Sequence, residues 1–183
     1  MTEQKKISEW LTLAGVESPS KPEFPNNEKF QLALGLILEE LMEAAVSAAD
    51  ENALEFLEKS IQKLKNEKIK IEKRGRLSGD LIELRDACAD LRVVMGNIVH
   101  FSGINYKFNE DFNEVMDSNF SKFCKTEEEA QKTIEAYSNG THPSKLGESI
   151  ECYYINVGEY WIIKRKSDNK VLKSIGFVEP IFK

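Results

Sequence analysis

Residues 32–49 read LALGLILEELMEAAVSAA and residues 81–101 read LIELRDACADLRVVMGNIVHF, and these are the two most apolar segments of the chain. Both follow the periodicity of an α-helix. A helix that is apolar on nearly all sides is expected to be buried. The two segments therefore predict a mainly helical fold in which they form core helices.

Both apolar segments also carry carboxylates, which are Glu39, Glu40 and Glu43 in the first and Asp86 and Asp90 in the second. Burying a carboxylate is costly unless a cation or a bound metal compensates its charge. At about 100° per residue, Glu40 and Glu43 lie about 60° apart on one helix face, and Asp86 and Asp90 share one stripe. Two such stripes facing each other resemble the carboxylate–metal sites of helical bundles. They predict a site for Mg²⁺, with Mn²⁺ as the alternative ion.

A solvated position for these carboxylates stays open at this point, because glutamates on helices usually face water. The context favours the metal site, since the acids interrupt a run of alanine and leucine and a second acidic helix matches the first. By contrast, the lysine- and glutamate-rich residues 58–73 are typical of a solvated helix face.

Composition restricts the class of protein. Of the 183 residues, 41% are hydrophobic and 31% are charged, which is ordinary for a soluble globular chain. A net charge of −6 argues against a general nucleic-acid binder. No uncharged apolar stretch reaches about 18 residues, so no membrane span is expected. Cys88, Cys124 and Cys152 are widely spaced without a CxxC, which predicts free thiols in a cytoplasmic protein.

The pattern along the chain predicts an all-α domain over residues 1–140 and a small β-rich extension over residues 141–183. The expected fold class is a bundle of four to five helices. Helical periodicity is found over residues 3–14, 28–49, 53–73, 81–102, 108–122 and 127–137. Their expected boundary residues are Asn26 or Asn27, Ser78 or Asp80, and Gly103. A β-hairpin or three-stranded meander is expected over residues 150–157, 160–165 and 171–173, where turn signals separate β-branched and aromatic runs.

The acidic pattern, E-E-x-x-E at residues 39–43 and D-x-x-x-D at residues 86–90, resembles that of the all-α NTP pyrophosphatases. This superfamily includes MazG-like enzymes, dimeric dUTPases and phosphoribosyl-ATP pyrophosphohydrolase. Residues 114–122 (EVMDSNFSK) are similar to the family signature EV..SN.SK. Residues 171–180 resemble the GK.LK…EP tail of the phosphoribosyl-ATP-pyrophosphohydrolase-like branch. The resemblance covers roughly residues 28–124, and the tail match is weaker.

The resemblance implies hydrolysis of a nucleoside triphosphate, or a related nucleotide, to the monophosphate and pyrophosphate. By its match to the family motif, the pair Glu40 and Glu43 is expected to bind metal. The resemblance also implies that Glu39 and Glu40 are catalytic. Glu39 matches the glutamate that positions or deprotonates the attacking water. Asp90 matches the aspartate of the second motif.

The chain departs from the family pattern at Ala87, where the family has a glutamate three residues before Asp90. Asp86, one helical turn before Asp90, is expected to supply the missing ligand, and Glu83 is the alternative. This departure keeps a second interpretation open, in which the chain is a catalytically weak or inactive relative that acts as a nucleotide-binding or interaction module. A purely structural helical protein is the third.

Contacts to phosphate require other groups, because the protein as a whole is acidic. Asn119 and Lys122 are the first candidates, followed by Arg85 and Lys125. The alternative role of Lys122 is a favourable interaction of its charge with the dipole at the C-terminal end of its own helix. Trp10, Trp161 and Tyr153 are candidates for stacking on a base, although aromatic side chains usually belong to the core. Neither a phosphate-binding GxxxxGK[ST] loop nor a GxGxxG motif is present.

A homodimer or homotetramer is expected, because helices as apolar as residues 32–49 and 81–101 need more cover than one small bundle offers. The expected partners are thus a nucleotide substrate and further copies of the chain, with no nucleic acid and no membrane. The sequence does not indicate the base or the sugar of the nucleotide.

Overall fold

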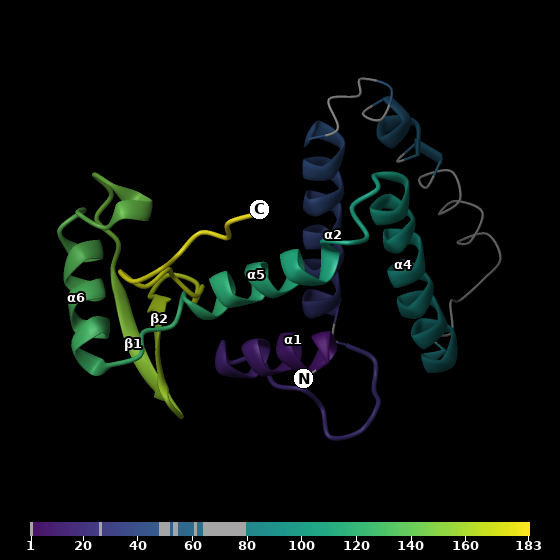
Figure 1. The fold of residues 1–183 in the computed structure, drawn as a ribbon. Helices are drawn as coiled ribbons and strands as arrows, with labels where there is room; N and C mark the ends of the chain where they lie inside the picture. Colours follow the sequence, from purple (N-terminus) through teal and green to yellow (C-terminus); the bar gives the residue numbers. More distant parts are fainter. Residues whose placement is uncertain (1, 26, 48–51, 53–54, 61, 64–79) are drawn as a thin grey trace. The chain divides into compact units, whose positions relative to one another are not determined.

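The computed structural model describes residues 2–25, 27–47, 52, 55–60, 62–63 and 80–183. It is mainly helical, with a small two-stranded antiparallel sheet near the C-terminus (Figure 1), which confirms the expected fold class. The elements are α1 (Glu3–Leu13), α2 (Asn27–Ser47), α4 (Leu81–Phe101), α5 (Phe108–Phe120), α6 (Glu127–Ser138), the 3-10 helix η1 (Pro143–Lys145), β1 (Cys152–Val157) and β2 (Tyr160–Arg165).

Local signals set several helix ends. The Asp80 carboxylate accepts hydrogen bonds from the backbone N–H of Ile82 at 2.7 Å and of Glu83 at 3.4 Å, so Asp80 caps α4. Gly103 has a φ of +71° just after α4, as expected of a glycine that ends a helix. Asn27 is the first residue of α2. The other two expected caps, Asn26 and Ser78, lie outside the described residues.

The helix expected over residues 53–73 falls only partly within the described chain. Residues 55–60 and 62–63 are helical, and residues 64–79 lie outside the described residues. In all the residues that the structure describes, no helix is long and apolar enough to cross a membrane.

The chain divides into two compact units, one of residues 1–18 with 92–183 and the other of residues 19–91. The first unit holds α1, α5, α6 and the sheet, and the second holds α2. The boundary expected at residue 140 stays a prediction. Helix α6, which precedes that residue, packs against both β1 and β2.

The core of the first unit lies between α6 and the sheet. Along α6, Ala130, Ile134 and Tyr137 recur at the spacing of one helix face and pack into this core. In β2, the consecutive residues Ile162 and Ile163 are both fully buried, so both faces of that strand are covered. The cluster of buried core residues is Cys124, Ala130, Tyr137, Cys152, Ile163 and Leu172.

The sheet is a hairpin whose strands pair in register from Cys152 opposite Arg165 to Val157 opposite Tyr160. Two residues connect the strands, and the first, Gly158, has a φ of +61° that glycine adopts without strain. The third strand expected over residues 171–173 is reduced to one bridge between Lys164 and Val171. The structure therefore contains the hairpin and not the meander.

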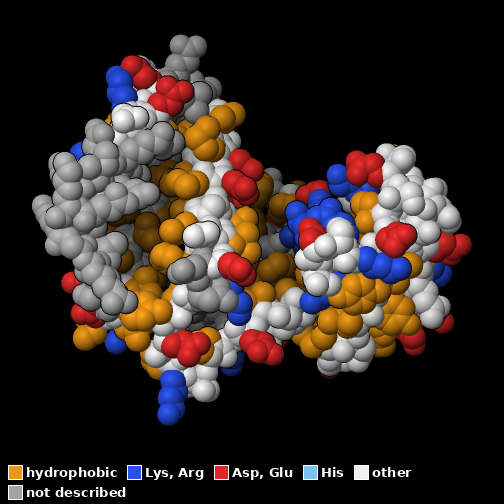
Figure 2. Space-filling view, turned by 180° about the vertical axis from the view of Figure 1, so that it is seen from behind, with side chains coloured by type: hydrophobic (Ala, Val, Ile, Leu, Met, Phe, Trp, Pro, Cys, Tyr) orange, Lys and Arg blue, Asp and Glu red, His pale blue; other side chains and the backbone are white. Residues whose placement is uncertain are grey.

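The apolar side chains of α2 and α4 are largely exposed, which contradicts the expected burial of these helices. Leu32 is 65% exposed, Val46 62% and Val93 66%. Figure 2 shows broad apolar areas at the molecular surface with carboxylates between them. Hydrophobic periodicity identifies the side chains that avoid water, but it does not say what covers them. The described part of this single chain does not supply that cover.

Candidate functional site

The acidic residues predicted to bind metal or to act in catalysis all lie at the surface. Glu39, Glu40 and Glu43 are exposed on α2, and Asp86 and Asp90 are exposed on α4. Within the described residues, no group of three or more carboxylate, histidine or cysteine side chains is placed to hold a metal ion. The described part of one chain therefore does not fit the expected Mg²⁺ site. The role of these side chains as ligands stays a prediction.

The two first candidates for phosphate binding are brought together at the end of α5. The Lys122 ammonium donates to Asn119 Oδ1 at 2.6 Å and lies 5.6 Å from the centroid of the Trp10 ring. Trp10 Nε1 donates to the Asn119 carbonyl oxygen at 2.9 Å. Helix α1, through Trp10, thus fixes the backbone of Asn119, and the Asn119 side chain positions Lys122.

Lys122 lies half-buried. Burial lowers the pKa of the Lys122 ammonium, and the nearby Lys173 and Lys170 lower the same pKa further. The Glu179 carboxylate acts in the opposite direction and raises it. The Lys122 ammonium is thus partly dehydrated, and burial is the largest cause of its lowered pKa.

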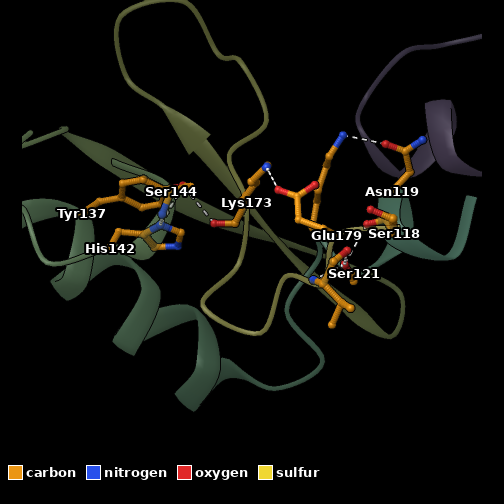
Figure 3. Close-up of polar contacts among 10 residues, drawn as sticks. Ser118, Asn119, Ser121, Tyr137, His142, Ser144, Lys173 and Glu179 are labelled. Carbon is orange, nitrogen blue, oxygen red and sulfur yellow. Dashed lines mark hydrogen bonds and ion pairs between the residues drawn. The ribbon is translucent and has the colours of Figure 1, made fainter. Parts of the chain in front are cut away.

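Lys173 and Glu179 come from the C-terminal tail. The Lys173 ammonium donates to the Glu179 carboxylate at 2.7 Å and lies 3.9 Å from the centroid of the Phe177 ring. Figure 3 shows Glu179 between the side chains of Lys173 and Asn119. Both residues of this ion pair act electrostatically on the Lys122 ammonium.

Ser121 attaches this tail to the end of α5. Its carbonyl oxygen accepts a hydrogen bond from Ser174 Oγ at 2.8 Å, and its hydroxyl accepts one from the Val178 backbone N–H at 3.0 Å. Further along, the Ile181 N–H donates to the Glu114 carboxylate at 3.2 Å. Residues 114–122 and 171–181, the two segments with signature-like sequences, are thus in contact. We call them together the α5–tail junction.

The base of the tail rests on a buried pair of rings. His142 stacks on Tyr137 with centroids 3.9 Å apart and planes 5° apart, and His142 Nδ1 lies 2.8 Å from Ser144 Oγ. The Tyr137 hydroxyl donates to the Lys173 carbonyl oxygen at 3.1 Å (Figure 3). Burial lowers the pKa of His142. These contacts position Lys173 and indicate a structural role for His142.

The remaining candidates do not join the α5–tail junction as ligands. Arg85 is exposed on α4. Lys125 is exposed and lines a pocket of about 430 Å³ together with Phe120, Ser121 and Tyr160. Trp10 stacks on Phe123 with centroids 5.9 Å apart, so its ring belongs to the packing of α1.

Reasoning from the sequence missed Lys173 and Glu179 as neighbours of Lys122. The available signal was the resemblance of the tail to a second signature, because segments that carry one family's motifs often meet at one site. Comparison of the chain with protein-family models, with curated proteins and with solved structures found no match.

Proposed function

We propose that this protein hydrolyses a nucleoside triphosphate, or a related nucleotide, to the monophosphate and pyrophosphate in a Mg²⁺-dependent reaction. The acidic motifs at residues 39–43 and 86–90 support the reaction type through their resemblance to the all-α NTP pyrophosphatases. The observation that carries the proposal is the pairing of Asn119 with a half-buried Lys122 among further cations. Such a site suits a phosphate group, because lysine ammonium groups are common phosphate ligands.

The proposal includes association into a homodimer or homotetramer. The described carboxylates of one chain do not form a group that could hold a metal ion, and apolar side chains surround them on the exposed surfaces of α2 and α4. Exposed apolar areas of this kind mark interaction surfaces. A second copy of the chain that packs there would cover these helices and change the surroundings of their carboxylates.

The test is the release of pyrophosphate from a panel of dNTPs and NTPs with Mg²⁺, with Mn²⁺ and with a chelator. We expect release that depends on the metal ion and falls on the order of 100-fold in Glu40→Gln. Glu159→Gln, which removes an exposed carboxylate in the β1–β2 turn, is the matched control and should retain activity. Absence of release from every nucleotide, or equal rates in the Glu40→Gln variant and the wild type, contradicts the proposal.

A second candidate function is nucleotide binding without turnover, by a catalytically weak or inactive relative. Ala87 at the place of a family glutamate favours it, as does the lack of a metal-binding group among the described residues. Titration calorimetry separates the two functions. Binding of a nucleotide that is not hydrolysed supports the second, and turnover supports the first.

A further inference from the structure

A pocket of about 430 Å³ lies in the first unit, between α1, the end of α5 and the start of β2. This volume is within the range of about 300 to 1,000 Å³ that small-molecule sites in proteins usually have. The lining residues that matter for its chemistry are Lys6, Glu9, Asp117, Phe120, Lys125 and Tyr160. The acidic motifs at residues 39–43 and 86–90 do not line it. The pocket is therefore a candidate for a function that those motifs do not describe.

Two aromatic residues line the pocket, and a buried third ring holds them in position. Phe120 and Tyr160 both pack edge-on against Phe123, with ring centroids 6.2 Å and 5.8 Å from that of Phe123. Phe123 is only 2% exposed and also stacks on Trp10, with centroids 5.9 Å apart. Rings that are already positioned lose little conformational entropy when a flat ligand stacks on them. This end of the pocket is thus suited to a planar ring.

The backbone around the pocket is fixed as well. Cys124 and Trp161 exchange two backbone hydrogen bonds, at 3.0 Å and 2.9 Å, and their chain neighbours in the pocket are Lys125 and Tyr160. Helix α1 is tied to the end of α5 by the hydrogen bond that Trp10 donates. Because these contacts are internal to the chain, the pocket exists before any ligand arrives.

The polar groups of the pocket are balanced in charge and have no internal partners. Its lining contains two lysines and two carboxylates, which sum to zero. The lining side chains that form no hydrogen bond or ion pair among the described residues are those of Glu9, Asp117, Lys125 and Tyr160. The two carboxylates accept hydrogen bonds, the ammonium donates, and the phenol hydroxyl does both. Such a lining favours a ligand that has no net charge and carries both donors and acceptors.

We propose that this pocket binds a nucleoside, with the base against the rings of Phe120 and Tyr160. A base has a flat face for stacking and carries donors and acceptors along its edge. The sugar hydroxyls are donors for the two carboxylates. A phosphate adds little here, because Glu9 and Asp117 oppose what the two lysines attract. The inference goes beyond the proposed function, in which Asn119 and Lys122 receive a phosphate group.

The experiment is an NMR titration of the isotope-labelled full chain with adenosine, guanosine, cytidine and thymidine, without divalent metal. We expect a nucleoside to shift the backbone amides of Phe120, Lys125 and Tyr160 to saturation. Tyr160→Leu keeps an apolar side chain but removes the stacking ring, so it should bind about 10-fold more weakly. Tyr106→Leu, at a tyrosine that is 78% exposed and does not line the pocket, is the matched control and should bind like the wild type.

Two comparison ligands test the class of ligand. The monophosphate of the bound nucleoside should bind within about 3-fold of the nucleoside, because the charges of the lining cancel. L-Tryptophan has a flat ring but also an ammonium and a carboxylate, and it should shift the same amides less at equal concentration. A monophosphate that binds more than about 3-fold more tightly would make the pocket a phosphate site and overturn the inference. Shifts caused by L-tryptophan and by no nucleoside would overturn it too.

The inference also fails if no nucleoside shifts these amides at millimolar concentration, or if Tyr160→Leu binds like Tyr106→Leu. Circular dichroism checks the fold of Tyr160→Leu, and Tyr160→Phe keeps the ring and should bind within about 3-fold of the wild type. Should Tyr160→Leu not fold, the amides shifted in the wild type still decide whether the ligand lies in this pocket.

The outcome is separable from that of the proposed function, because the titrations involve neither Mg²⁺ nor turnover. A chain without pyrophosphohydrolase activity that binds a nucleoside in this pocket keeps the inference and loses the proposed function. An active chain whose pocket amides do not respond to any nucleoside keeps the function and loses the inference.

Discussion

The backbone N–H of Val178 donates to the Ser121 hydroxyl at 3.0 Å, and this bond joins the C-terminal tail to the end of α5. The Ser121 carbonyl oxygen also accepts a hydrogen bond from Ser174 Oγ at 2.8 Å. One residue thus holds the tail at two points. The two tail residues bonded to Ser121, Ser174 and Val178, are the chain neighbours of Lys173 and Glu179, which form an ion pair.

Replacing Ser121 with alanine is expected to loosen the tail while the core between α6 and the sheet stays folded. The variant loses the acceptor for the Val178 N–H and the donor to the Ser118 carbonyl oxygen. A typical hydrogen bond contributes about 1 kcal/mol, so hydrogen exchange of the Val178 amide should accelerate by roughly 5-fold. Ser167→Ala, at an exposed turn, should leave that exchange rate unchanged. Equal protection of Val178 in both variants would show that Ser121 does not hold the tail.

A charge introduced on α2 is expected to disrupt self-association. Leu38 is 55% exposed in the single chain, and Leu38→Lys would place an ammonium in any interface formed by the apolar face of α2. Sedimentation of the wild type should show a dimer or tetramer, and the variant should shift toward monomer. Leu146→Lys, at a residue that is 73% exposed outside α2 and α4, is the control. A monomeric wild type, or an equal effect of both substitutions, would exclude this interface.

Acid is expected to destabilise the protein through His142. Burial lowers the pKa of His142 below 6.5, so below that pH the unfolded chain binds a proton that the folded chain resists. The free energy of unfolding should therefore fall as the pH drops below about 6.5, until the lower pKa of the folded state is reached. Urea titrations should show a smaller fall in His142→Phe, which keeps a ring against Tyr137. His100→Phe changes an exposed histidine and should retain the wild-type pH dependence.

Alkaline pH is expected to act through Cys124. Burial raises the pKa of this thiol from 9.0 to about 11. Between those two values the unfolded chain loses the proton and the folded chain keeps it, so the free energy of unfolding should fall by about 3 kcal/mol. Cys124→Ala should flatten this dependence in denaturant titrations, whereas Cys88→Ala, at an exposed cysteine, should not. A slope that is the same in both variants would assign the effect to other groups.

Several local features could be predicted from single residues. Asp80 caps α4, Gly103 ends it, and Gly158 opens the two-residue turn of the hairpin. Each depends on hydrogen bonds or backbone angles within a few residues of the chain. The exposure of the apolar side chains of α2 and α4 could not be predicted in the same way. Their apolar side chains require cover, but the sequence does not specify whether this chain or another copy provides it.

By itself, the sequence determined where the helices and the hairpin lie, because backbone hydrogen bonding and side-chain periodicity are local. It also singled out Asn119 and Lys122, together with the signature-like tail. Only the tertiary structure decided that Lys173 pairs with Glu179 and that Asn119 and Lys122 are joined by a hydrogen bond. Trp10 from α1 bonds the Asn119 backbone, and Ser121 at the end of α5 bonds the tail, and these residues are distant along the chain. Contacts between distant segments follow from packing in three dimensions, and no local pattern encodes them.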